Sequence, residues 1–286
     1  MNADLLQYIF SGLTTGSIYA LIALGFCVVS NTMGIVNFVQ VDFVTLGGMF
    51  LFSALFALNL PVVPALVLAI ILVSLVAMII ERFGLRPATT QNHMILVFLT
   101  VGLSTIVRGA IKMIWGTNRM AVPPLTPDVP VQILGANVLP QALWIFALTL
   151  VAIAGLTWFF YGTSLGLSMR AVAANPVAAA VVGIPTGRIR LTSYAIAGAL
   201  GGLAGILVTP ITTLSYDVGV LLGLKGFAAA ILGGFGSFPG AIIGGLGLGL
   251  LETLSAGYIS SAYKDVVAFI VLLVVLCTRP KGLLGK

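Results

Sequence analysis

Charged residues are scarce in this 286-residue chain: only 7% of its residues are Asp, Glu, Lys or Arg, whereas 60% are hydrophobic and the mean hydropathy is +1.20. A soluble domain normally carries about 25% charged residues. So few charges cannot cover the surface of a soluble protein of this size, and lipid must therefore be the solvent for most of the chain. The net charge of +6 comes from thirteen basic residues spread over many segments, which indicates membrane topology rather than nucleic-acid binding.

Cysteine and histidine are equally scarce, with two cysteines and one histidine in the chain. Cys27 and Cys277 lie in separate apolar runs, and we expect both thiols to be buried as small hydrophobic groups. A metal site needs several clustered ligands, and the chain contains no Cys/His cluster around its single histidine, His93. We therefore expect no metal site.

Motifs for enzymatic chemistry are missing as well. The closing segment 282–286 lacks the spacing and the hydroxyl residue of a phosphate-binding GxxxxGK[ST] loop. No HExxH motif occurs, and no apolar run contains paired aspartates. The sequence therefore predicts a protein that is not an enzyme, binds no cofactor itself and hydrolyses no nucleotide by that route.

Long intervals without charge divide the chain into apolar segments, and a helix needs roughly 20 apolar residues to cross the hydrocarbon core. The runs are continuous rather than alternating, which favours helices over barrel strands. The candidate spans are residues 5–29, 42–59, 61–81, 94–114, 140–161, 191–213, 238–257 and 265–279. The Gly-rich segment 218–236 is either a short ninth span or a re-entrant piece. We predict an all-α fold, a single transmembrane helical bundle over residues 1–286 with eight to nine spans and broken or re-entrant segments.

Basic residues are distributed unevenly between alternate connecting segments, and Lys and Arg favour cytoplasmic loops. The richer set has eight members: Arg82, Arg86, Arg170, Arg188, Arg190, Arg279, Lys281 and Lys286. The opposite set has four: Arg108, Lys112, Arg119 and Lys264. We expect the richer side, which includes the C-terminus, to be cytoplasmic, and the proline-rich segment 122–140 to be an external loop. The side of the N-terminus stays open because it depends on whether 218–236 spans.

Glycines recur at four-residue spacing in two of the late apolar segments. Small residues at this spacing let helix backbones approach closely in lipid, where no hydrophobic effect drives helices together. The pairs are Gly198 and Gly202, Gly201 and Gly205, Gly240 and Gly244, and Gly245 and Gly249. They predict close helix packing within the bundle and say nothing specific about function.

A punctuated segment, 162–190, lies on the predicted cytoplasmic side. Asn175 is a good N-cap, Pro176 suits the first helical position, and Gly183 can end the helix. The pattern predicts a helix of about seven residues, roughly 10 Å long, outside the membrane. Such a rigid element suits docking to a cytoplasmic partner, although a passive interfacial helix is the alternative.

Polar residues interrupt two apolar segments, Asn37, Gln40 and Asp42 early in the chain and Lys225 late in it. Polar groups inside the membrane are costly and usually face a cavity or a partner. Broken helices of transporters place such residues on the solute path. We predict that these four line a substrate pathway; the alternative is that they cap helices or form an ion pair such as Asp42 with Lys225.

Several segments together resemble a known family, the shorter of the two membrane subunits of branched-chain amino acid ABC importers. The resemblance covers essentially the whole chain and would be weak on any one segment alone. The segments are residues 12–25, 34–38, 170–184, 232–241, 263–265 and 279–285.

This resemblance implies a multi-pass permease of the bacterial inner membrane that moves branched-chain or related small amino acids inward. It implies a second related permease subunit, two cytoplasmic ATPase subunits that bind ATP and Mg, and a periplasmic solute-binding protein. It also implies that the segment with Arg170, Asn175, Pro176, Ala179, Gly183 and Ile184 couples to the ATPase. Relatives carry amides, urea or small carboxylates, so the solute stays open, and an ion-coupled secondary carrier is the other reading.

Overall fold

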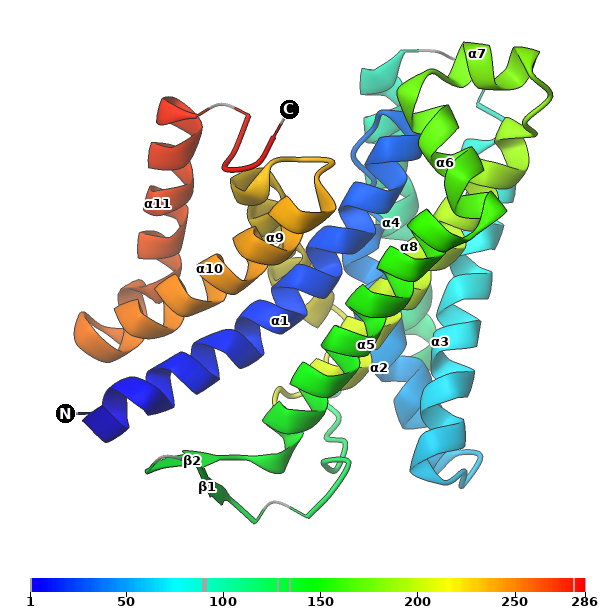
Figure 1. Ribbon diagram of the computed structural model, residues 1–286. Coiled ribbons are helices and arrows are strands. Elements are labelled where there is room, and N and C mark those ends of the chain that lie inside the picture. The colour runs from blue at the N-terminus through cyan, green and yellow to red at the C-terminus, as the bar shows by residue number, and fades with distance from the viewer. Residues whose placement is uncertain (1, 89–91, 128, 134, 280, 286) are drawn as a thin grey trace.

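The computed structural model describes residues 2–88, 92–127, 129–133, 135–279 and 281–285, and it is almost entirely helical (Figure 1). The helices are α1 (Asn2–Met33), α2 (Gln40–Phe56), α3 (Val62–Ile79), α4 (His93–Trp115), α5 (Pro140–Gly162), α6 (Ser164–Ala174), α7 (Pro176–Val181), α8 (Thr186–Val208), α9 (Val218–Gly233), α10 (Phe238–Tyr258) and α11 (Lys264–Thr278). A π-helical segment, η1 (Ile80–Leu85), continues α3, and a 3-10 turn, η2 (Ser261–Tyr263), precedes α11. Strands β1 (Val131–Ile133) and β2 (Ala136–Val138) form an antiparallel hairpin.

The long helices run between two ends of the molecule, which we name by the small elements found there. The α7 end carries α6, α7, η1 and the C-terminal segment, and the hairpin end carries β1, β2 and the N-terminus (Figure 1). Seven helices are long and apolar enough to cross a membrane, and α2 and α9 are shorter apolar helices. The predicted multi-span helical bundle is therefore confirmed.

Helix α9, in the segment predicted to be either a short span or a re-entrant piece, is one continuous helix of sixteen residues. It follows a segment at the hairpin end, where Leu214 pairs with Met120. At its other end, the backbone N–H groups of Leu283 and Leu284 donate to the carbonyls of Leu232 and Gly233 at 2.9 Å. These bonds satisfy carbonyl groups that the end of a helix otherwise leaves unpaired. The carboxyl end of α9 therefore lies beside the C-terminal segment at the α7 end.

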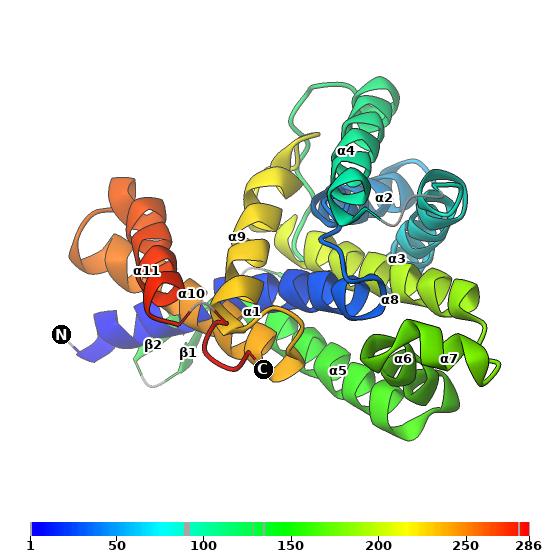
Figure 2. The same ribbon diagram turned by 90° about the horizontal axis from the view of Figure 1, so that it is seen from above.

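Two helices form the centre of the bundle. In α1, 89% of the most apolar stretch is buried, and in α8 the fraction is 72%. The corresponding fractions are only 17% in α4, 22% in α5 and 6% in α11, which lie on the rim (Figure 2). The central helices therefore contact protein on most sides, whereas the rim helices present large apolar side chains outward.

The overlapping glycine pairs of α8 serve two different neighbours. A side chain at Gly198 or Gly202 would collide with Ala77 or Val73 of α3. A side chain at Gly205 would instead reach the backbone of Val44 in α2 within 1.8 Å. Glycine on both faces thus lets α2 and α3 approach the α8 backbone, as the spacing predicted.

Helix α10 uses its glycines in the same way against α1 and α9. Gly245 and Gly249 face the backbones of Ala20 and Gly16 in α1, whereas Gly244 faces Ala229 in α9. The predicted role of all four pairs in close helix packing is confirmed.

The segment 122–140, predicted as an external loop, contains the β1–β2 hairpin, whose two three-residue strands are too short to produce a recognisable alternation in the sequence. One expectation from the sequence was wrong. Cys277 is exposed on α11 although it lies in an apolar run, because this rim helix turns most of its side chains outward; Cys27 is buried.

Candidate functional site

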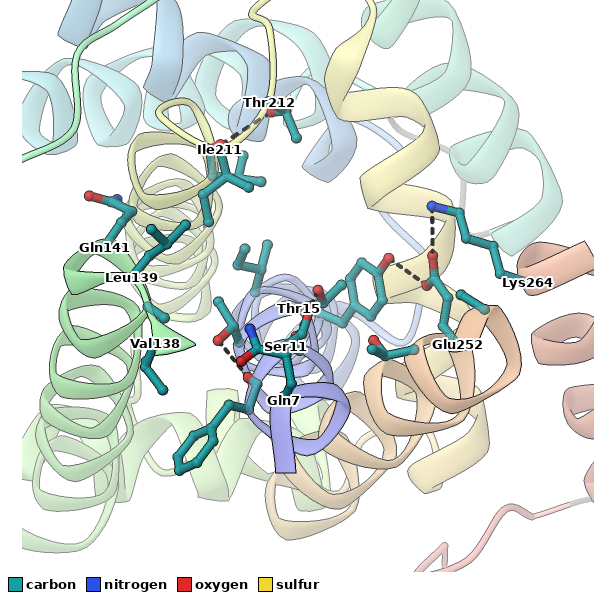
Figure 3. Close-up of a pocket in the computed structure, with 18 of the residues that line it drawn as sticks. Gln7, Ser11, Thr15, Val138, Leu139, Gln141, Ile211, Thr212, Glu252 and Lys264 are labelled. Carbon is teal, nitrogen blue, oxygen red and sulfur yellow. Dashed lines mark hydrogen bonds and ion pairs between the residues drawn. The ribbon is translucent and has the colours of Figure 1, made fainter. Parts of the chain in front are cut away.

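A cavity of about 460 Å³ opens at the hairpin end, between α1, the hairpin, α5, α9 and α10 (Figure 3). Its volume falls in the range typical of small-molecule sites. One wall carries hydroxyl groups of α1, from Ser11, Thr14 and Thr15, and the opposite side carries apolar groups such as Leu139 and Ile211. The cavity therefore offers both polar and apolar surface to a small solute.

A network of charged side chains borders this cavity. The Lys225 ammonium lies 2.6 Å from Glu252 Oε1 and 2.7 Å from Asp265 Oδ1. The Tyr19 hydroxyl donates to Glu252 Oε2 at 2.7 Å, and Lys264 Nζ lies 3.7 Å from Glu252 Oε1. Figure 3 shows Lys264 and Glu252 pointing toward each other on one side of the cavity. Three separate helices, α9, α10 and α11, thus bring two ammonium and two carboxylate groups together.

The network suits a solute that carries both charges. Its two cations and two anions balance, so no single charge is left in excess. Lys225 and Glu252 are nearly buried, whereas the Lys264 and Asp265 side chains are 45% and 49% exposed. Lys264, the exposed member that also lines the cavity, can exchange its protein partner for a carboxylate of a bound molecule.

Asp42 forms a second cluster, between α2 and α4. Its carboxylate is buried and lies 2.9 Å from the Arg108 Nε, and it also accepts a hydrogen bond from the Ser104 hydroxyl. Arg108 Nη2 donates to Ser104 Oγ at 2.6 Å. The suggested pairing of Asp42 with Lys225 is therefore wrong, because each of the two found a nearer partner of opposite charge.

Asn37 and Gln40 lie at the break between α1 and α2, and both are fully buried. Asn37 Oδ1 accepts a hydrogen bond from the Val39 backbone N–H at 3.2 Å, so this side chain does stabilise the turn. The Gln40 amide donates to Ala197 O at 3.1 Å and fills space left by Gly25 of α1 and Gly201 of α8. Of the four residues predicted for the pathway, only Lys225 lines the cavity.

The punctuated segment folds locally as its sequence predicts. The Asn175 side chain accepts hydrogen bonds from the backbone N–H groups of Val177 and Ala178, both at 3.0 Å, and Pro176 begins α7. Gly183 follows α7 with φ +86°, a conformation that favours glycine. Ala179 faces inward and is buried, and Ile184 packs partly against the core. Arg170 stacks on the Tyr161 ring at 4.8 Å.

The outer surface of α7 is apolar. Val177, Val181 and Val182 are 73%, 83% and 76% exposed; Val177 and Val181, four residues apart, share one side of α7, and Val182 follows directly after its end. Exposed apolar groups gathered at one tip of a membrane protein indicate a contact surface. These three valines were missed in the sequence, where only the helix-capping signals were noticed.

Sequence reasoning also missed Glu252, Asp265, Tyr19 and Arg108 as partners of the predicted residues. Glu252 carries a signal that could have been used, because it is the only charged residue within the predicted span 238–257. Which helix it would face depends on the packing of α9 against α10, which a single sequence does not reveal.

Comparison with known proteins places these features in context. Residues 8–276 match the family model described as the permease component of branched-chain amino acid transport systems. The chain is 34% identical to the permease protein LivH of the high-affinity branched-chain amino acid transport system of Escherichia coli K12, over 98% of this chain and 96% of that protein. It is 35% identical to BraD of Pseudomonas aeruginosa, with the same coverage.

More distant proteins are also similar. A probable LivH of Methanocaldococcus jannaschii is 29% identical over 94% of this chain and 89% of that protein. Among solved structures, PsaBC from Streptococcus pneumoniae in complex with Fab covers 98% of this chain and 92% of that chain, with 14% identity. Its TM-score of 0.46 is too low to establish a shared fold.

Proposed function

Since the chain belongs to the family of branched-chain amino acid transport permeases, we propose that it is the membrane-spanning subunit of an ATP-driven importer for branched-chain or related small amino acids. The observation that carries the proposal is similarity to named high-affinity permeases along nearly the whole chain. Its partners are a second related permease, two cytoplasmic ATPase subunits that bind ATP and Mg, and a periplasmic solute-binding protein.

The α7 end is the cytoplasmic end in this proposal, within a bacterial inner membrane. Seven of the eight basic residues of the richer set belong to segments at or near this end, and the eighth, Lys286, lies outside the described residues. Basic residues favour the cytoplasmic side. If α2 and α9 are counted with the seven long helices, the nine passes of this proposal place the C-terminus in the cytoplasm and the N-terminus outside.

Helix α7 is the docking helix for the ATPase, within the coupling loop 162–190. Its exposed valines supply the contact surface, and the bonds from Asn175 make it rigid. Ala179 and Ile184 pack it against the bundle, Pro176 and Gly183 set its two ends, and Arg170 stacks on Tyr161 at the end of α5. ATP binding shifts the permease between its inward- and outward-facing states because the ATPase dimer binds the two states with different affinity.

The cavity at the hairpin end is the external vestibule for the solute. Its charged network meets the ammonium and carboxylate groups that every amino acid carries, and its apolar wall meets an aliphatic side chain. Lys225, Glu252 and Lys264 provide the polar contacts. Asn37, Gln40 and Asp42 stay proposed members of the path further inside the bundle.

Reconstitution tests the proposal. The chain is co-expressed with its second permease and ATPase subunits, placed in liposomes with the binding protein outside, and supplied with ATP inside. We expect uptake of labelled leucine, isoleucine or valine that requires ATP hydrolysis. Uptake of urea, short amides or carboxylates instead would reassign the solute, and gradient-driven uptake without ATPase subunits would identify a secondary carrier.

A matched pair of variants tests α7. Val181→Asp places a charge on the exposed surface and should abolish solute-stimulated ATP hydrolysis while leaving the bundle folded, because desolvating a charge at an interface is costly. Ala179→Asp places the same charge on the buried side and should lower the folded yield instead. Normal stimulated hydrolysis by Val181→Asp would contradict the docking role of α7.

A further inference from the structure

Glu81 is an acidic residue buried at the α7 end of the molecule, in a position that the transport proposal does not use. It lies in η1, the π-helical continuation of α3, and its side chain has no exposure to solvent. Neither carboxylate oxygen accepts a hydrogen bond from any described residue. Buried charges are normally hydrogen-bonded, and short π-helical segments are frequent at functional sites. An unsatisfied carboxylate in such a segment therefore calls for an explanation.

Helix α8 presents two further unsatisfied groups to Glu81. Arg190 Nε lies 3.8 Å from Glu81 Oε1, close enough for an ion pair but too far for a hydrogen bond, and it has no other partner among the described residues. The Tyr194 hydroxyl is fully buried, is electrostatically coupled to Glu81 and is likewise without a described hydrogen-bond partner. Arg190 and Tyr194 are four residues apart and share one helix face. Two potential donors, Arg190 Nε and the Tyr194 hydroxyl, thus interact electrostatically with Glu81, and neither donates a hydrogen bond to it.

Two more arginines complete this cluster. Arg82 and Arg86 also interact electrostatically with Glu81. The Arg86 guanidinium lies against Gly187 in the first turn of α8, where a side chain would come within 2.4 Å of it. The cluster therefore connects the end of α3 to the start of α8, and α8 begins a few residues after α7.

We infer that Glu81, Arg190 and Tyr194 are positioning residues that transmit movement of α7 to the bundle, an inference that rests on the proposed docking role of α7. In the observed arrangement Glu81 and Arg190 are 3.8 Å apart, and the Tyr194 hydroxyl makes no hydrogen bond to a described residue. In the other transport state, α8 slides along α3 until Glu81 accepts direct hydrogen bonds from Arg190 and Tyr194.

Tyr194→Phe separates this inference from a purely structural role. If the observed arrangement were the only one, removing an unbonded buried hydroxyl would be neutral or slightly stabilising. If the hydroxyl bonds to Glu81 in the second state, the variant should transport roughly tenfold less solute per ATP hydrolysed, because coupling energies of this kind change equilibria by 5- to 150-fold. Ser193→Ala is the matched control, since the Ser193 hydroxyl donates within its own helix to Ile189 O.

Glu81→Gln supplies the second measurement, in the assembled complex in liposomes with uptake and ATP hydrolysis recorded together. We expect basal hydrolysis to persist and the ratio of uptake to hydrolysis to fall by a similar factor. An unchanged ratio in Tyr194→Phe overturns the inference, whether or not Glu81→Gln assembles. Absence of ATP-driven uptake in the unmodified complex would instead refute the proposed function. Coupling retained in Val181→Asp would refute the docking role of α7 and, with it, the transmission of α7 movement inferred here, while leaving the transport function intact.

Discussion

The Asp42 cluster and the Lys225 network differ in what surrounds them, although the sequence marks both in the same way, by a lone charge in an apolar segment. Asp42 is enclosed by α2 and α4 and has one cationic partner, Arg108. Lys225 borders a cavity and has two anionic partners on two helices. A charged group that has several ionic partners and borders a cavity can exchange one partner for a bound solute. A charged group that is buried with one ionic partner keeps that partner. The comparison teaches that an intramembrane charge indicates function only together with its surroundings.

Breaking the Asp42 pair should have the largest effect. Arg108→Leu leaves the Asp42 carboxylate buried without a cation, which costs about 3–5 kcal/mol of stability in comparable buried pairs. We expect a severe loss of folded protein, measured as yield and thermal unfolding temperature in detergent. The double variant Asp42→Leu/Arg108→Leu should recover most of that loss, because an apolar pair of similar volume often replaces a buried ion pair without penalty.

Transport by that double variant sharpens the comparison further. Normal uptake per assembled complex would remove Asp42 from the solute path and leave it a structural role. Slow uptake with normal assembly would place both clusters on the path and end the distinction between them.

The Lys225 network should respond in function rather than in folding. Glu252→Gln keeps the shape of the side chain and leaves Lys225 paired with Asp265, so we expect normal assembly. Uptake should fall by roughly tenfold or more, since a charge-assisted contact with the solute is worth about 1.5–3 kcal/mol. A folding defect without a transport defect would show that this network has a structural role and does not bind the solute.

Tyr19→Phe should have a smaller effect of the same kind. The substitution removes one hydrogen bond to Glu252 and keeps the ring beside Lys225. The Glu252 carboxylate then retains its bond to Lys225, and we expect uptake to fall a few-fold, in line with about 1 kcal/mol for a single hydrogen bond. Initial uptake rates at several solute concentrations provide the measurement, and a rise in KM alone would place Tyr19 in solute binding.

Asp265→Asn should have the smallest effect. Its side chain is 49% exposed, and solvent screens an exposed ion pair to about 0–1 kcal/mol. We expect nearly unchanged stability and uptake, with the same assays as for Glu252→Gln. A loss of uptake as large as that of Glu252→Gln would mean that Asp265 and Glu252 contribute equally to the pairing with Lys225, despite the greater exposure of Asp265.

Much of the fold could be predicted from the sequence because its signals are local. Span positions follow from runs of apolar residues, and the capping of α7 follows from Asn175, Pro176 and Gly183. The glycine spacing of α8 and α10 correctly indicated close packing. None of these signals needs information on which helices are neighbours.

The site was harder to predict because its contacts join distant parts of the chain. Lys225 was identified, yet its partners lie 27 and 40 residues away. Asp42 was paired with the wrong cation because charge alone does not show whether α4 or α9 packs beside α2. The sequence cannot show that the polar groups of Glu81 and Tyr194 lack hydrogen-bond partners. A chain in which the same two residues made ordinary hydrogen bonds could have the same sequence signals.

The bonds from Leu283 and Leu284 to the end of α9 also bear on how the chain is made. During synthesis α9 enters the membrane before Leu283 and Leu284 are translated, and α10 and α11 are inserted after α9 and before these two residues. During that interval the carbonyl groups of Leu232 and Gly233 lack the partners that they have in the finished protein. In a nascent chain halted after α11, the last turn of α9 would therefore lack these two hydrogen bonds. A fusion partner that replaces the residues after 281 would leave the same two carbonyl groups without their partners.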